Sequence, residues 1–327
     1  MSAALPCLHR PTPFQALSVF EKGPYLFQQF LNALQLAGFY LPLAIAFSLI
    51  QAISGRVFLA FGQVAMYGSF AAVYSCFGFL LQGYSDGPAA LLALAVAVLC
   101  SASLGLAAGK IVFLPLAKSS SLAFMIGSLG FAIVLQEVMR VTTGAQDIWV
   151  PPIFAGTRLS LVEGHFPVRI TGANLLGISV SLTSVICTLL LMRYTRFGRQ
   201  FRACTENIKL AQLCGVNTQR IFILSFALGS ALAAVAGWMS AIVYGGTNFS
   251  VGMMLGFKAM FASVAGGEGS IRGAILGALA LAVLETGWSA AFGTSYRDAG
   301  VFSIVIFVLL LRQGRRDMLT EAEGNKQ

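Results

Sequence analysis

The stretch Gly87–Gly109 decides the fold class: it reads GPAALLALAVAVLCSASLGLAAG and contains no charged residue. A helix needs about 20 consecutive apolar residues to cross the hydrocarbon core of a bilayer. The stretch has this length, and it lacks the alternation of apolar and polar residues that is typical of a strand in a membrane barrel. Because unpaired backbone amides are too costly in lipid, we expect it to form a transmembrane helix.

Similar apolar blocks make up most of the chain. They are Gly23–Gly55, Val57–Ser85, Ser119–Gln136, Thr171–Met192, Ile221–Phe257, Gly273–Phe292 and Ala299–Leu311. The block Ile221–Phe257 is long enough for two passes if Gly245–Asn248 form a turn. The sequence therefore predicts an all-α, polytopic helical membrane protein with eight or nine transmembrane segments. Hydropathy leaves open whether Val57–Ser85 spans fully, and with it the side on which the N-terminus lies.

Composition agrees with this class and gives a single membrane domain. Of the 327 residues, 57% are hydrophobic and 10% are charged, whereas soluble domains carry about 25% charged residues. We expect a transmembrane domain over residues 23–316 and a polar C-terminal tail over residues 317–327. Residues 1–22 form an N-terminal tail without a cleaved signal; a short amphipathic helix at the membrane interface and a tail without structure are both open for it.

The net charge of +9 is explained by clustered bases. One loop carries Arg193, Arg196, Arg199, Arg202, Lys209 and Arg220 against the single acid Glu206. By the positive-inside rule this loop is cytoplasmic, and a second basic cluster, Arg312–Arg316, lies on the same side. The stretch Val141–Ile170 then falls outside. Topology accounts for the charge, so we expect no nucleic acid as a partner.

No constellation of residues for covalent chemistry is present. The two histidines, His9 and His165, have no neighbours at ligand spacing, and the six cysteines form no C-x-x-C pair. Gly109-Lys110 lacks the upstream glycine and the hydroxyl residue of a phosphate-binding loop. We therefore expect no enzyme, no metal site and no cofactor. If ATP drives this protein, another chain must bind it.

The basic loop also contains a candidate docking helix. Thr205–Cys214 is rich in helix-forming residues and is followed by Gly215, a residue suited to the position after a helix end. In such a helix Leu210, Leu213 and Cys214 share one side. Two interpretations are open: a short amphipathic helix that docks in a groove of a partner, or a solvated positive-inside loop.

Four segments in register favour the first interpretation. RACTENIKLAQLCGVN at Arg202–Asn217 resembles the cytoplasmic coupling segment of permeases in the branched-chain amino acid ABC importer family, in particular its H-type subunit. FALGSALAAVAG at Phe226–Gly237 and GGEGSIRGAILG at Gly266–Gly277 are similar to the motifs that follow in that family. Tyr296-Arg297-Asp298-Ala299 resembles its Y-R-D-A stretch before the last helix. The resemblance extends from about Gln28 to Arg316.

The resemblance implies a transport function with several partners. It implies a permease of the bacterial inner membrane that imports amino acids, branched-chain ones by default, or related small polar solutes by alternating access. The implied partners are a second permease subunit of the M-type, two ATPase subunits and a periplasmic substrate-binding protein. The implied ATPase-coupling residues are Arg202, Ala203, Lys209, Leu210, Ala211, Leu213 and Gly215.

This chain departs from the H-type pattern at two places. Phe58–Gln63 stands where H-type subunits carry an N-F-A-H-G-like stretch, and its Gly62-Gln63 pair is closer to M-type subunits. Lys209 and Leu210 occupy positions that the family often fills with Glu-Ala. These departures leave open which solute the chain transports and which ATPase subunit it binds. A homodimer of this permease and a heterodimer with a second permease are also both open.

Two isolated charges at membrane depth are the candidate pathway residues. Lys258 follows an apolar run, and Glu285 interrupts Gly273–Phe292. Charges inside a membrane face a cavity or each other. Lys258 and Glu285 are therefore expected to pair across neighbouring helices or to meet the charged ends of a zwitterionic solute. Two rival functions stay open: a secondary transporter or channel that works without ATP, and a membrane-embedded enzyme.

Overall fold

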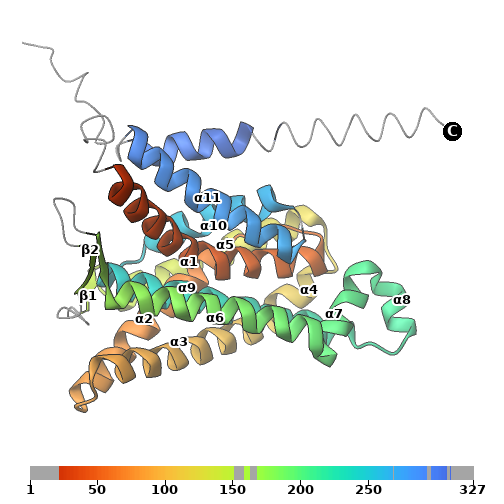
Figure 1. The fold of residues 1–327 in the computed structure, drawn as a ribbon. Helices are drawn as coiled ribbons and strands as arrows, with labels where there is room; N and C mark the ends of the chain where they lie inside the picture. The colour runs from red at the N-terminus through yellow and green to blue at the C-terminus, as the bar shows by residue number, and fades with distance from the viewer. Residues whose placement is uncertain are drawn as a thin grey trace, which may run out of the picture.

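The computed structural model confirms a polytopic helical membrane protein (Figure 1). It describes residues 22–150, 158–162, 168–267, 269–292, 296–307 and 310. Within these ranges seven helices are long and apolar enough to cross a bilayer. They are α1 (Lys22–Ser54), α2 (Phe61–Leu81), α3 (Asp86–Ala108), α5 (Ser121–Thr142), α6 (Gly172–Tyr194), α9 (Thr218–Tyr244) and α11 (Ile271–Phe292).

Two further apolar helices lie within the described residues. α10 (Val251–Gly266) is shorter, with 16 residues, and residues 297–307 are also helical. The long block Ile221–Phe257 divides into α9 and α10 as expected. Gly245 ends α9 in the left-handed conformation, at φ 71°, which glycine adopts without strain.

The block Val57–Ser85, whose full span hydropathy leaves open, is not helical throughout. Helix α2 begins only at Phe61, and residues 57–59 have no regular structure. The Phe58 ring packs edge-on against the rings of Phe61, Phe113 and Phe226. This aromatic cluster holds the irregular segment inside the bundle.

The two ends of the bundle carry different structures (Figure 1). At one end lie two short antiparallel ladders, β1 (Ile148–Trp149) with β4 (Gly246–Thr247) and β2 (Arg158–Val162) with β3 (Val168–Thr171). The start of α1 lies at this end. At the other end lie α7 (Arg196–Glu206), α8 (Ile208–Leu213), the π-helical turn η1 (Gly109–Phe113) and α4 (Leu114–Leu116).

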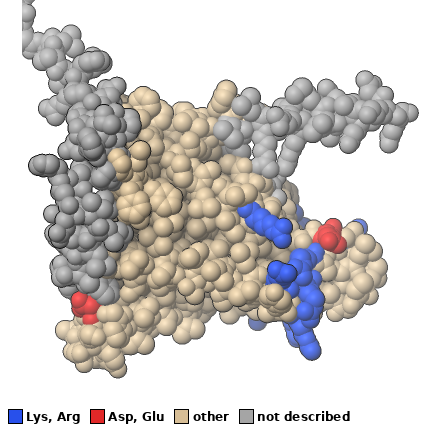
Figure 2. All heavy atoms as spheres, in the orientation of Figure 1, with Lys and Arg blue, Asp and Glu red and all other residues tan. Residues whose placement is uncertain are grey.

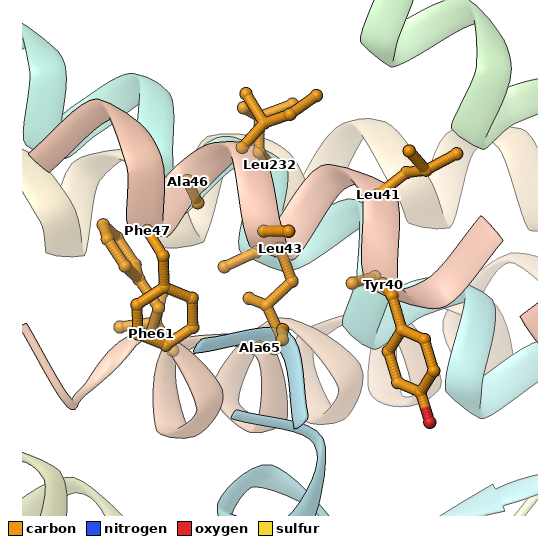
Figure 3. Close-up of a cluster of buried hydrophobic side chains, with 14 of the residues drawn as sticks. Tyr40, Leu41, Leu43, Ala46, Phe47, Phe61, Ala65 and Leu232 are labelled. Carbon is orange, nitrogen blue, oxygen red and sulfur yellow. The ribbon is translucent and has the colours of Figure 1, made fainter. Parts of the chain in front are cut away.

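Helices α1 and α9 form the centre of the bundle. In their most apolar windows 83% and 72% of the residues are buried, against 28% in α5, α6 and α11. Figure 3 shows Tyr40, Leu43 and Phe47 of α1 beside Phe61 of α2 and Leu232 of α9. The outer helices therefore keep broad apolar faces for lipid or for a partner subunit.

Small residues allow the helices to approach closely. A side chain added at Gly277 would meet the carbonyl oxygen of Ala262, and one at Gly273 would meet that of Gly266. Helices in lipid gain no hydrophobic free energy from association, so contact between backbones through small residues stabilises the pair. The Gly273/Gly277 pair thus sits at the α10–α11 contact.

Candidate functional site

The candidate docking segment is two helices rather than one. The sequence predicts a helix over Thr205–Cys214, but α7 ends at Glu206 and α8 begins at Ile208. Asn207 between them is extended, at φ −156° and ψ 112°, and its side-chain oxygen accepts hydrogen bonds from the backbone N–H groups of Lys209 and Leu210. The predicted single helix is therefore wrong, because Asn207 caps a new one.

The end of α8 agrees with the sequence. Gly215 has φ 80°, and the N–H of Val216 donates to the carbonyl oxygen of Ala211. This is the arrangement in which a left-handed glycine ends a helix.

Three apolar side chains of α8 are exposed, together with the polar residues Lys209 and Gln212. Ile208, Leu210 and Leu213 are 46%, 59% and 83% exposed, and we call these three residues the α8 apolar edge. Lys209 and Arg202 are also exposed. Figure 2 shows the Lys and Arg side chains of this face gathered near α7 and α8.

One expected coupling residue points the other way. Ala211 is only 4% exposed and belongs to the core of the chain, and Ala203 is half-buried. A contact surface for a partner on α8 must therefore use the α8 apolar edge rather than Ala211.

The two charges at membrane depth meet each other. The Nζ of Lys258 in α10 lies 2.8 Å from Oε1 of Glu285 in α11, and their side chains are 8% and 1% exposed. Of the two arrangements that the sequence leaves open, the structure therefore contains the pair across neighbouring helices.

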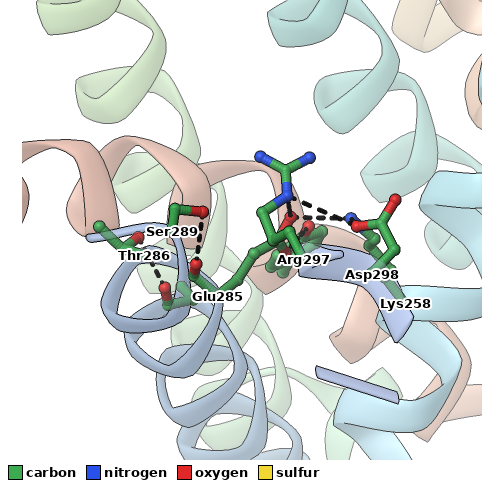
Figure 4. Close-up of polar contacts among 8 residues, drawn as sticks. Lys258, Glu285, Thr286, Ser289, Arg297 and Asp298 are labelled. Carbon is green, nitrogen blue, oxygen red and sulfur yellow. Dashed lines mark hydrogen bonds and ion pairs between the residues drawn. The ribbon is translucent and has the colours of Figure 1, made fainter. Parts of the chain in front are cut away.

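The pair belongs to a larger network (Figure 4). Lys258 Nζ also contacts Oδ1 of Asp298 at 2.7 Å, and Nε of Arg297 contacts Glu285 Oε1 at 3.1 Å. The Tyr40 hydroxyl donates to Glu285 Oε2 at 2.6 Å. The two cations and two anions give these four groups no net charge. Together with Tyr40 they join α1, α10, α11 and the start of the last helix.

Most of this network lines a cavity of about 400 Å³. The cavity is lined by Tyr40 and Tyr244, by apolar residues of α1 and α10, and by β1 and β4 near its mouth. Lys258, Glu285 and Arg297 all contribute to its wall. It is therefore reached from the end of the bundle that carries the short strands, and we call it the outer cavity.

Tyr40, Arg297 and Asp298 are members of this network that the sequence does not single out. Arg297 and Asp298 appear there only as part of a motif at the start of the last helix. Adjacent opposite charges at that position are the one signal that points to them. Tyr40 gives no such signal, since tyrosine is common in apolar helices.

Comparison with known proteins gives a matching family and several similar permeases. Residues 29–311 match the family described as "Branched-chain amino acid transport system / permease component". The chain is 33% identical over 292 residues to the high-affinity branched-chain amino acid transport system permease protein LivH of Escherichia coli K12, with 89% of this chain and 95% of the relative covered. It is 32% identical over 286 residues to the permease protein BraD of Pseudomonas aeruginosa, with 87% and 93% covered.

A solved structure is similar at lower identity. PsaBC from Streptococcus pneumoniae in complex with Fab has a TM-score of 0.44 and 17% identity, with 89% of this chain and 93% of that chain covered.

Proposed function

The chain belongs to the family of branched-chain amino acid ABC importer permeases, and from this premise we propose that it carries branched-chain amino acids inward. It is a multi-pass permease subunit of the bacterial inner membrane. A periplasmic binding protein delivers the solute to the end with the short strands. A second permease of the M-type completes the pathway, and two separate ATPase subunits supply the energy.

The α8 apolar edge supports the part of this proposal that concerns the ATPase subunits. Leucine side chains that are 59% and 83% exposed beside a basic helix are costly in water, and α8 lies beyond the end of α6 rather than within a membrane span. A hydrophobic groove on an ATPase subunit would cover them. The capped start of α8 at Asn207 and its glycine end give the edge a defined shape for such a contact.

Purification of the permease with its ATPases tests the proposal. We expect ATP hydrolysis by the assembled complex to rise when the binding protein is loaded with leucine, isoleucine or valine. A complex that responds instead to urea, short amides or aromatic acids would replace the proposed solute. A chain that transports alone in an ion gradient would replace the proposed mechanism.

The topology gives a further prediction. Gln82 is exposed at the turn between α2 and α3, and Ser119 is exposed beside α4 at the opposite end of the bundle. In a cysteine-free background, Gln82→Cys should react with an impermeant thiol reagent applied to intact cells. Ser119→Cys should react only after permeabilisation. The reverse pattern would invert the orientation and place α8 outside.

Lys258 and Glu285 keep a role in the proposed transport cycle, as a neutral pair in the wall of the outer cavity rather than as a free charged site. In this proposal the network holds α10 and α11 together while solute enters, and alternating access requires these helices to move relative to α1.

A further inference from the structure

A second polar pair, formed by two glutamine amides, lies at membrane depth. It lies on a different side of α10 from the Lys258–Glu285 pair. Nε2 of Gln63 in α2 donates to Oε1 of Gln136 in α5 at 3.3 Å. Gln136 lies about 9 Å inside the end of α5 at Thr142, at 1.5 Å per residue, which places it within the hydrocarbon region. Primary amides are costly to bury in lipid unless each polar atom has a partner.

The pair is not fully satisfied by the protein. Gln63 is only 4% exposed, and its Oε1 has no hydrogen-bond partner among the described residues. The two amides line a cavity of about 40 Å³ between α2, α5 and α10. A single water needs about 15 Å³, so the cavity has room for water beside the two amides. We call this cavity the amide slot.

The backbone beside the amide slot is also unusual. The segment before α2 is irregular, and the N–H of Leu59 donates to Oγ of Ser128 in α5 at 3.2 Å. Gly62 lies directly against Gly252 and Gly256 of α10. Irregular backbone at membrane depth occurs where protein buries it or where it lines a water-filled cavity.

The rim of the amide slot is open on the outside of the chain. Leu129, Ile133 and Met253 are 41%, 53% and 50% exposed. If lipid covered this rim, its hydrocarbon would lie against two amides to which it cannot hydrogen-bond. A protein surface can cover the apolar rim while water between that surface and the slot hydrogen-bonds to the amides.

From these observations we propose that Gln63 and Gln136 line the solute route, and that the second permease subunit closes the open side of the amide slot. This inference rests on the proposed transport function and names residues that contact the solute. An amide offers both a donor and an acceptor and carries no charge, so the pair suits the ammonium and carboxylate groups of a zwitterion. The apolar rim suits a branched aliphatic side chain.

Thiol labelling within α5 tests the proposal. In the assembled transporter without its native cysteines, Gln136→Cys is compared with Val134→Cys. Val134 is 61% exposed, lies at similar depth and faces the opposite side of the helix. The probe is 2-aminoethyl methanethiosulfonate, which reacts with the thiolate, a species that forms in water rather than in lipid.

We expect Gln136→Cys to react at least about tenfold faster than Val134→Cys, as a shift of one pKa unit of the thiol would give, and excess leucine should slow it. Equal, slow labelling at both positions would place the slot against lipid and overturn the proposal. Fast labelling of Gln136→Cys that leucine leaves unchanged would overturn its place on the solute route.

A second pair of variants separates this inference from the function on which it rests. Gln136→Leu should lower leucine uptake by about tenfold, the effect of losing one buried hydrogen bond, while the ATPase subunits still co-purify. Gln82→Leu removes an exposed amide outside the bundle and should leave uptake unchanged. Normal uptake by Gln136→Leu would contradict the inference alone. An unsubstituted complex without any ATP-driven uptake would contradict the proposed function, while the labelling contrast still tests the slot.

Discussion

Replacing Glu285 by leucine should remove most of the folded permease from the membrane, and replacing Lys258 by methionine in the same chain should restore most of it. Glu285→Leu leaves Lys258 and Arg297 facing Asp298 alone, so the network keeps an uncompensated positive charge. Breaking a buried ion pair by removing one partner costs about 3–5 kcal/mol, a large part of the stability of a protein domain.

The double variant is expected to recover because its charges balance again. Arg297 and Asp298 remain, with their nearest charged atoms 3.5 Å apart, and Lys258→Met fills similar space without a charge. The measurement is the amount of monodisperse permease after detergent extraction, together with its thermal unfolding. Normal amounts of Glu285→Leu with normal uptake would show that the network does not stabilise the packing of the helices. If the double variant gave as little folded permease as Glu285→Leu, side-chain volume rather than charge would explain the loss.

Leu213→Glu should insert normally yet separate the permease from its ATPase subunits. Leu213 is 83% exposed, so a carboxylate there is hydrated in the free chain and does not disturb the fold. In an apolar groove the same carboxylate would be buried without a partner, at a cost of several kcal/mol and hence a loss of affinity by orders of magnitude. ATP-driven uptake should fall with the co-purified ATPase.

Gln219→Glu is the matched control, since it adds the same charge at an exposed polar position just inside α9. It should keep both the ATPase and uptake. Ala211→Glu, the substitution that a sequence-based view of the segment suggests, should instead damage the fold because Ala211 is buried. Full ATPase recovery with Leu213→Glu would show that α8 is a solvated loop.

The sequence predicts the membrane helices well because their signal is length and hydrophobicity, which lipid requires of every span. The split of Ile221–Phe257 at Gly245 and the glycine end of α8 also follow from local chemistry. These features depend on residues that are close together in the chain.

The parts that the sequence misses depend on which way an apolar helix faces. In lipid, the buried and the exposed sides of a helix are both apolar, so periodicity does not separate them. This is why Gln63 and Gln136 are not recognised as neighbours. The irregular residues 57–59 are missed for another reason, because hydropathy reports burial and not hydrogen bonding.

The network shows both the strength and the limit of such reasoning. Rare charges at membrane depth identify Lys258 and Glu285 as residues that need partners. Their actual partners include Asp298 and Tyr40, which come from the start of the last helix and from α1. Only the packing of helices that are distant in sequence brings these groups together.

Uptake of labelled leucine into sealed proteoliposomes tests the transport function most directly. The vesicles contain this chain, its second permease subunit and the two ATPase subunits, with ATP enclosed and the binding protein outside. Uptake should require both ATP and the binding protein, and should stop when either is omitted. Leucine uptake by this chain alone, driven by an ion gradient and indifferent to ATP, would contradict its assignment as the permease subunit of an ABC importer.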